Sequence, residues 1–367
     1  MSALAARTGA INLGQGFPDT DGPQEVLEAA VTALRGGANQ YPPGAGIAPL
    51  RQAIARHQQR FYGIELDFES EVLVTAGATE ALAATILALC APGDEVVCFE
   101  PSYDAYGALI ELAGARMVTV PLEPPGWGFD PGRLAAAVNP RTRVVLVNSP
   151  HNPTGRVLGP GELEAVAGVC REHDVLAVTD EVYEHLVFDG VHVPLSTLDG
   201  MAERTLTISS AGKTFSVTGW KVGWVSGPAP LVSAVRNVKQ FLTYVNGAPF
   251  QPAVALGLDL PDHVFATMAT DLRARRDLLC EGLEAAGMGV ERPQATYFAT
   301  GDVGPLGLGS GAQFCRDLPA RCGVVAIPMS AFAASEAVAP LVRFAFCKHP
   351  RVLADAAERL AGLAGTR

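Results

Sequence analysis

The stretch EVLVTAGATEALAATILALCAPGDEVVCFE, from Glu71 to Glu100, decides the fold of this chain. It starts with a short apolar run, EVLVT, continues with a helical pattern from Thr79 to Cys90, and ends after Pro92-Gly93 with a second run, DEVVCFE. Two β-branched runs separated by a helix are typical of parallel strands joined by a crossover helix. The stretch therefore predicts an α/β fold with a mainly parallel sheet.

The same alternation extends outward from this unit. The runs ARMVTVPL, RVVLVNSP, VLAVTDEVY and RTLTISS follow, with a helix from Gly161 to His173 among them, and their near-continuous apolar character predicts strands buried on both faces. After about Gly227, two helical stretches, Pro230 to Val245 and Asp262 to Gly287, precede TYFATGD, GVVAIPMS and LVRFAFCK. This change predicts a second, α+β unit. The first forty residues, with one helix from Gln24 to Arg35, resemble an arm more than a domain.

Composition excludes several classes of function. The length of 367 residues predicts two domains, and the net charge of −11 makes nucleic acid and anionic membranes poor partners. Seven cysteines without a C-x-x-C pair predict neither a disulfide framework nor a zinc site, and they favour a reducing cytoplasm. The N-terminus lacks a signal-peptide pattern, and the longest apolar stretch, around Ala81 to Ala91, is too short to span a bilayer.

Polar clusters follow four of the predicted strands, at the edge where open α/β sheets bind ligands. In VTAGATEAL, the backbone N–H groups of Ala78 and Thr79 at a helix start can bind an anion, although taken alone an ordinary strand-to-helix turn with a Thr cap is the simpler reading. In NSPHNPTG, prolines fix a loop and leave the Asn152 amide free to donate a hydrogen bond, although a proline-fixed turn without function is the simpler reading.

The other two clusters add a carboxylate and an amine. Asp180 ends the run VLAVTD, where a carboxylate either caps the strand or keeps a pyridine nitrogen protonated, and Tyr183 follows three residues later. The string SSAGKTFSVTGWKVGW contains Lys213 in a predicted loop, flanked by Ser210 and Lys221, which suit a phosphate. Because its neighbours are small or apolar, we expect Lys213 to be a partly desolvated nucleophile and not a surface lysine.

These motifs run in order from Gly14 to Lys348, and they resemble those of the class I/II aminotransferases of pyridoxal phosphate (PLP) fold type I. Within the family, SPHNPTG and TDEVYEHLVFDG are similar to two groups, the bacterial N-succinyldiaminopimelate aminotransferases and the kynurenine aminotransferases/cysteine-conjugate β-lyases. NQYPPGAGIAPLR and GAPFQPAVAL favour the first group. The resemblance implies a large PLP-binding α/β domain over residues 25–270 and a smaller α+β domain from both chain ends, residues 1–24 and 271–367.

The resemblance also implies roles for single residues. Lys213 would bind PLP covalently as a Schiff base, and Asp180 would pair with the ring nitrogen. The further cofactor contacts that it implies are Asn152 and Tyr183 at the ring oxygen, Tyr103 stacked on the ring, and Ala78, Thr79, Ser210, Lys221 and Tyr41 at the phosphate. Tyr41 would come from the second subunit of a homodimer with shared active sites. Arg343 would bind the substrate carboxylate, assisted by Asn152 and the backbone at Gly16.

The expected activity is a ping-pong transfer of an amino group between an L-amino acid and 2-oxoglutarate, with N-succinyl-L,L-2,6-diaminopimelate as a candidate donor. The alternatives are a kynurenine-type aminotransferase, a cysteine-S-conjugate β-lyase and, more distantly, a non-catalytic PLP-binding sensor domain. No metal site is expected, since His151, His173 and His185 lack ligand spacing. The sequence departs from the family pattern at two places. Family members have a further helical stretch before INLGQGFPD, and Val245 stands where the kynurenine enzymes have a histidine.

Overall fold

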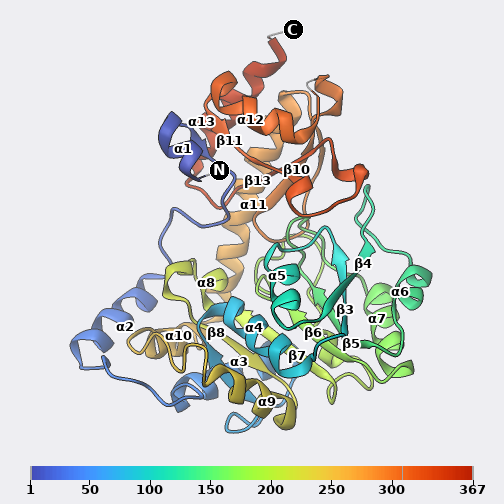
Figure 1. Cartoon of the computed structure of the whole chain (residues 1–367). Helices are drawn as coiled ribbons and strands as arrows, with labels where there is room; N and C mark the ends of the chain where they lie inside the picture. The colour runs from blue at the N-terminus through green and yellow to red at the C-terminus, as the bar shows by residue number, and fades with distance from the viewer. Residues whose placement is uncertain (1, 308, 366–367) are drawn as a thin grey trace.

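A seven-stranded mixed sheet organises the larger part of the molecule in the computed structural model, which describes residues 2–307 and 309–365 (Figure 1). Its strands are, in spatial order, β2 (Val72–Thr75), β8 (Gly223–Ser226), β7 (Thr205–Ser210), β6 (Leu176–Asp180), β5 (Thr142–Asn148), β3 (Glu95–Glu100) and β4 (Arg116–Pro121). In this sheet β8 runs in the direction opposite to that of the other six strands. The predicted α/β fold with a mainly parallel sheet is confirmed.

Both faces of this sheet are buried, as the apolar runs predicted. On β3, Val96 contributes to the core under α4 (Gly77–Leu89), α5 (Ala105–Leu112) and α9 (Ala229–Lys239), whereas the next residue, Val97, contributes to the core under α6 (Pro131–Ala137) and α7 (Pro160–Glu172). Successive side chains of a strand point to opposite faces, so a strand covered on both sides needs apolar residues at every position.

Helices α3 (Ala48–Tyr62) and α10 (Phe250–Leu258) pack together over β2 and β8, and α2 (Gln24–Arg35) lies against α10. The predicted helix over Pro230 to Val245 is shorter than expected, because α9 ends at Lys239 and turns follow it. Both α9 and α10 pack on the larger sheet, so the change in sequence texture after Gly227 does not coincide with the end of this part of the fold.

A second, smaller part is built from both ends of the described chain (Figure 1). It contains the antiparallel sheet β12 (Ile327–Pro328), β13 (Leu341–Ala345), β10 (Phe298–Asp302) and β9 (Gly289–Glu291), covered by α12 (Gly311–Cys322) and α13 (Pro350–Ala361). Near the N-terminus, α1 (Ser2–Thr8) leads to β1 (Ile11–Asn12), which pairs in parallel with β11 (Val324–Val325).

The long helix α11 (Asp262–Ala285) runs from the larger sheet into the smaller part (Figure 1). The boundary that the sequence suggested, between residues 270 and 271, falls inside this continuous helix, and the division into two domains remains our proposal. None of the helices within residues 2–307 and 309–365 is both long and apolar enough to cross a membrane.

Candidate functional site

A cavity of about 540 Å³ lies at the edge of the seven-stranded sheet where β5, β6 and β7 end, with β10 and β13 of the smaller sheet opposite. Its lining includes Gly16, Ala78, Thr79, Tyr103, Asn152, Asp180, Tyr183, Ser210, Lys213, Lys221 and Arg343. Every residue predicted to contact cofactor or substrate within its own subunit therefore meets in one place. Tyr41 lies outside this cavity, 82% exposed and edge-on to Tyr244.

The reversed direction of β8 places a lysine beside the start of α4. Because β8 is antiparallel to β7, it begins at the edge where β7 ends, with Ser210 opposite Gly223. A side chain at Gly223 would meet the Gly77 carbonyl carbon at 2.6 Å, and one at Gly77 would lie 3.3 Å from Lys221 Nζ. These two glycines allow Lys221 to approach the free N–H groups at the start of the 13-residue helix α4. The ammonium and the N–H groups together favour an anion at this position.

Asp180 ends β6 in the middle of the cavity wall. Its Oδ2 accepts a hydrogen bond from the Tyr106 hydroxyl at 2.7 Å, and its side chain is buried. Burial raises the pKa of Asp180, while the Tyr106 hydrogen bond and the charge of Lys213 oppose the rise. The sequence analysis missed Tyr106, although its position three residues after Tyr103 on a helical pattern could have indicated it.

Lys213 lies on a single helical turn, α8 (Ala211–Thr214), and not in a loop as predicted. The turn closes because Phe215 N donates to Ala211 O at 2.8 Å, directly after β7 ends. Lys213 Nζ donates to the Tyr297 hydroxyl at 3.0 Å, and that hydroxyl donates to Gly16 O at 2.7 Å. The sequence analysis missed Tyr297, since TYFATGD was interpreted only as a strand.

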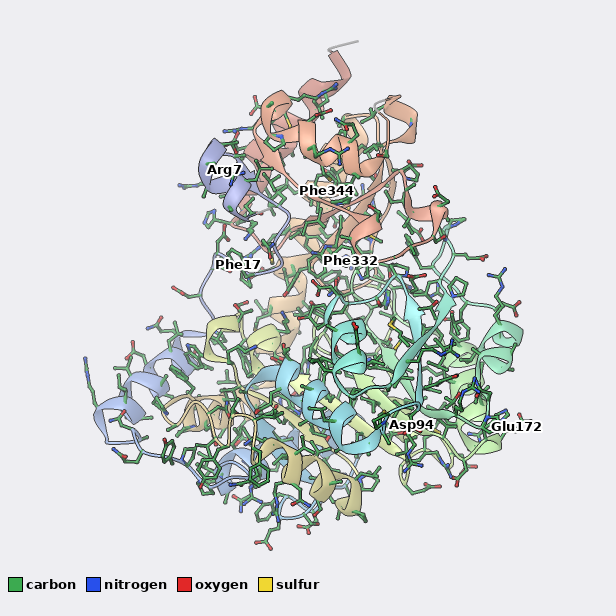
Figure 2. The ribbon with its side chains drawn as sticks, in the orientation of Figure 1. Arg7, Phe17, Asp94, Glu172, Phe332 and Phe344 are labelled. Carbon is green, nitrogen blue, oxygen red and sulfur yellow. The ribbon has the colours of Figure 1, made fainter. Side chains whose placement is uncertain are left out.

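Arg343 lies on β13 at the opposite wall of the cavity and is only 6% exposed. Its guanidinium carbon lies 3.9 Å from the ring centre of Phe298 and 4.3 Å from that of Phe332, which occupies the junction of the two parts (Figure 2). Burial lowers the pKa of Arg343 to about 10, so the side chain stays cationic at neutral pH. Without the family resemblance Arg343 would be interpreted as a surface residue on an edge strand, whereas β13 lies between β12 and β10.

The hydrogen bonds of Arg343 leave one of its N–H donors free to bind a carboxylate. Nη1 donates to Asn152 Oδ1 at 2.9 Å and Nη2 donates to Gly14 O at 3.2 Å, but the buried Nε has no partner. No ion pair of Arg343 occurs within the described part of the chain. A buried guanidinium without an anionic partner is costly, and a ligand carboxylate would supply one.

The loop NSPHNPTG connects the two walls. The Asn148 side chain donates to Asp180 O at 2.8 Å and accepts from Asn152 N at 2.8 Å, which fixes the loop beside β6. The Asn152 side chain thereby reaches Arg343 through its oxygen and keeps its NH₂ group for a ligand. Next to it, His151 is buried, with Nδ1 2.8 Å from the Thr154 hydroxyl.

Known proteins resemble this chain in sequence and in fold. Residues 8–360 match the family model described as aminotransferase class I and II. The chain is 55% identical to the probable N-succinyldiaminopimelate aminotransferase of Mycobacterium tuberculosis, over 99% of this chain and 95% of the relative. The solved structure of N-succinyldiaminopimelate aminotransferase from Mycobacterium tuberculosis superposes with a TM-score of 0.97 at 55% identity, covering 99% of this chain and 96% of that one. These matches confirm the predicted fold.

Two other relatives carry different substrate names. The methionine aminotransferase of Escherichia coli is 40% identical over 98% of this chain and 94% of its own length. The mouse kynurenine–oxoglutarate transaminase 3 is 37% identical over 97% of this chain and 85% of its own length. Identity is therefore higher to the N-succinyldiaminopimelate enzyme than to either of these.

Proposed function

The chain belongs to the class I and II aminotransferases, a family that uses PLP, and from this premise we propose that it transfers the amino group of N-succinyl-L,L-2,6-diaminopimelate to 2-oxoglutarate. The observation that carries the substrate proposal is the 55% identity over 99% of the chain with the Mycobacterium tuberculosis enzyme. The 37% identity with the kynurenine transaminase makes that substrate the weaker alternative.

The donor set of the cavity fits PLP. A phosphate suits the start of α4 beside Lys221, because backbone N–H groups and an ammonium face one position there. A protonated ring nitrogen suits Asp180, since a cation beside a buried carboxyl offsets the desolvation that raises its pKa. The remaining proposed contacts are Ala78, Thr79 and Ser210 at the phosphate, Asn152 and Tyr183 at the ring oxygen, and Tyr103 on the ring face.

When bound, PLP supplies an aldehyde carbon that captures amino groups and a ring that accepts the electron pair released at the substrate Cα. Lys213 is the proposed point of covalent attachment and, once freed, the base that takes the Cα proton and later returns it as an acid. Tyr297 positions this amine: its hydroxyl proton goes to Gly16 O, so its oxygen accepts from Lys213 Nζ.

Arg343 is the proposed binding residue for the substrate α-carboxylate. Its planar guanidinium offers parallel N–H donors to two carboxylate oxygens, and the unpartnered Nε is one of them. Phe298 and Phe332 pack against the guanidinium, and the buried side chain is shielded from water. Because water is excluded, the attraction between this arginine and a carboxylate is stronger than at an open surface.

We also propose that the enzyme acts in the cytoplasm as a homodimer with shared active sites. Its small-molecule partners are an amino acid and a 2-oxo acid. Support for the dimer comes from four exposed apolar side chains, namely Tyr41, Phe241, Leu242 and Tyr244, since such side chains are costly in water unless another surface covers them. Tyr41 of one copy would then reach the phosphate in the site of the other.

A panel of amino donors tests the proposal. Purified enzyme with PLP and 2-oxoglutarate is supplied with N-succinyl-diaminopimelate, methionine, kynurenine or an aromatic amino acid, and glutamate is measured. We expect the highest kcat/KM with N-succinyl-diaminopimelate. A higher value with kynurenine or methionine would contradict the substrate proposal, and pyruvate with ammonia as main products from a cysteine conjugate would indicate a β-lyase.

A further inference from the structure

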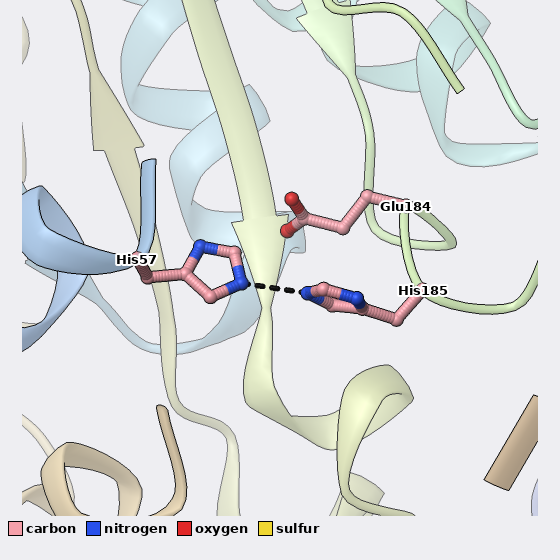
Figure 3. Close-up of side chains that lie close together, drawn as sticks. All are labelled: His57, Glu184 and His185. Atoms are coloured by element: carbon pink, nitrogen blue, oxygen red, sulfur yellow. Dashed lines mark hydrogen bonds between the residues drawn. The ribbon is translucent and has the colours of Figure 1, made fainter. Parts of the chain in front are cut away.

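Two imidazoles and a carboxylate meet in the interior behind the strand edge that carries Asp180 (Figure 3). His57 comes from α3, and Glu184 and His185 come from the turn that follows β6. The two Nε2 atoms face each other at 2.6 Å, and the three potential ligand atoms lie within 4.8 Å of one another. None of these residues belongs to the lining of the large cavity.

One oxygen of this cluster lacks a hydrogen bond of ordinary geometry. Glu184 is only 5% exposed, and its Oε1 accepts a hydrogen bond from the Ser209 hydroxyl. Its other oxygen, Oε2, is buried and accepts no hydrogen bond of ordinary geometry. The Tyr62 hydroxyl lies near the same carboxylate. A buried polar group left unpaired costs about 1–3 kcal/mol, and more if it is charged. In Figure 3 the carboxylate lies over the gap between the two rings, where a cation would satisfy it.

Neighbouring polar side chains orient two members of the cluster, as they do around metal centres. Ser209 fixes the orientation of the carboxylate, and the Gln58 side-chain amide lies 3.4 Å from His57 Nδ1. A flip of that amide would present its oxygen to Nδ1–H, which leaves the Nε2 lone pair free to bind an ion. Phe61 and Phe265 pack against both imidazoles, so the two rings lie in a largely aromatic environment.

We propose that His57, Glu184 and His185 bind one transition-metal ion of the zinc class, with a water molecule completing the coordination. Two imidazole nitrogens and one carboxylate oxygen are a donor set of zinc and cobalt sites, whereas calcium and magnesium prefer oxygen alone. Zn–N bonds of about 2.0–2.1 Å at a tetrahedral angle separate two ligand nitrogens by about 3.3 Å. The rings must therefore move apart by about 0.7 Å, and His185, which lies on a turn and is partly exposed, provides the movement.

The ion would have a structural role. It would connect α3 to the turn that directly follows Asp180 and Tyr183, and Ser209 on β7 precedes the proposed phosphate ligand Ser210. Fixing these segments together stabilises the edge of the sheet on which the cofactor site is built. This cluster was not predicted from the sequence, because His57 and His185 are separated by 128 positions.

Metal titration of the PLP-loaded, metal-stripped enzyme tests the proposal. We expect one Zn²⁺ bound per chain after dialysis, a rise of the thermal unfolding midpoint with Zn²⁺, and the visible absorption of four-coordinate cobalt when Co²⁺ is the probe. His57→Gln and His185→Gln should abolish stoichiometric binding, and Glu184→Gln should weaken it more than tenfold. His173→Gln, at an exposed histidine, is the matched control and should bind like the wild type.

Two results would overturn the proposal. One is less than stoichiometric binding by the wild-type enzyme at a tenfold excess of metal. The other is binding that persists undiminished in His57→Gln, which would mean that surface groups bind the ion. If His57→Gln does not fold, as judged by its circular dichroism, Glu184→Gln decides, because it keeps the shape of the side chain: unchanged affinity in that variant refutes the site.

Discussion

The two ends of the cavity are built in different ways. At the end proposed to hold the cofactor, Asp180, Lys213 and Lys221 come from the ends and connections of neighbouring strands in one sheet. At the end proposed to hold the substrate, Arg343 reaches Asn152 across 191 positions of sequence and Gly14 across 329. The first end is an assembly of local motifs, whereas the second exists only after the smaller sheet has formed against the larger one. Loss of chemistry and loss of substrate binding should therefore be separable.

The largest expected effect is at Lys213. Lys213→Ala removes both the covalent attachment and the proton-transferring amine, so kcat should fall at least about ten-thousandfold. Stopped-flow assays with the best donor measure it, and PLP should still bind through the phosphate contacts. Activity within tenfold of the wild type would mean that another base carries the reaction.

Arg343→Gln should affect the other end. Losing one partner of a buried charge pair costs about 2–5 kcal/mol, so kcat/KM should fall by about thirtyfold to several thousandfold while PLP absorbance is retained. Arg292→Gln is the matched control, because its ion pairs with Asp277 and Glu284 are half exposed and should be worth under about 1 kcal/mol. Equal losses in both variants would contradict a specific carboxylate site.

Tyr297→Phe tests the contact between the two ends. It removes the hydrogen bonds to Lys213 and Gly16, each worth about 0.5–1.5 kcal/mol, so kcat should drop about tenfold. A positioning role also predicts that KM stays close to the wild-type value, because the variant still binds the substrate. An unchanged kcat with a raised KM would assign Tyr297 to substrate binding instead.

The smallest expected effect is on the pH dependence of stability, and it concerns His151 in the loop that connects the two ends of the cavity. Burial lowers the pKa of His151 to about 3 from an ordinary 6.5, so the unfolded chain takes up this proton first as the pH falls. The contribution of the neutral His151 ring to the free energy of unfolding is at its full value above about pH 6.5 and declines toward pH 3. At pH 6 it has already fallen by about 1 kcal/mol. Urea unfolding of His151→Gln should lose this part of the pH dependence. His173→Gln should keep it, and equal slopes in both variants would contradict the assignment.

Features of the fold that follow from periodicity and from short motifs could be predicted from the sequence alone. The alternation around Glu71 to Glu100 predicted the sheet, and the helix over Gln24 to Arg35 has the predicted bounds. That Asp180 and Lys213 lie at one edge was predictable, because Asp180 ends β6, Lys213 lies on the turn after β7, and parallel strands end at the same edge of a sheet. The role of Tyr41 in a second subunit stays a prediction.

What the sequence did not reveal depends on long-range contacts. Tyr106 meets Asp180 across 74 positions and Tyr297 meets Lys213 across 84. Periodicity identifies which face of a strand or helix is buried, but it does not indicate which distant face will lie opposite. Arg343 and Asn152, which are 191 positions apart, belong to the same class, since the packing of the two parts brings them together.

Chemical trapping of the cofactor tests the assignment of Lys213 most directly. The PLP-loaded enzyme is reduced with borohydride, digested and mapped by mass spectrometry. We expect a single pyridoxyl label, on the peptide that contains Lys213, and no label in Lys213→Ala. A label on Lys221 or any other lysine, or the absence of a covalent label from enzyme that binds PLP and transaminates, would contradict the assignment.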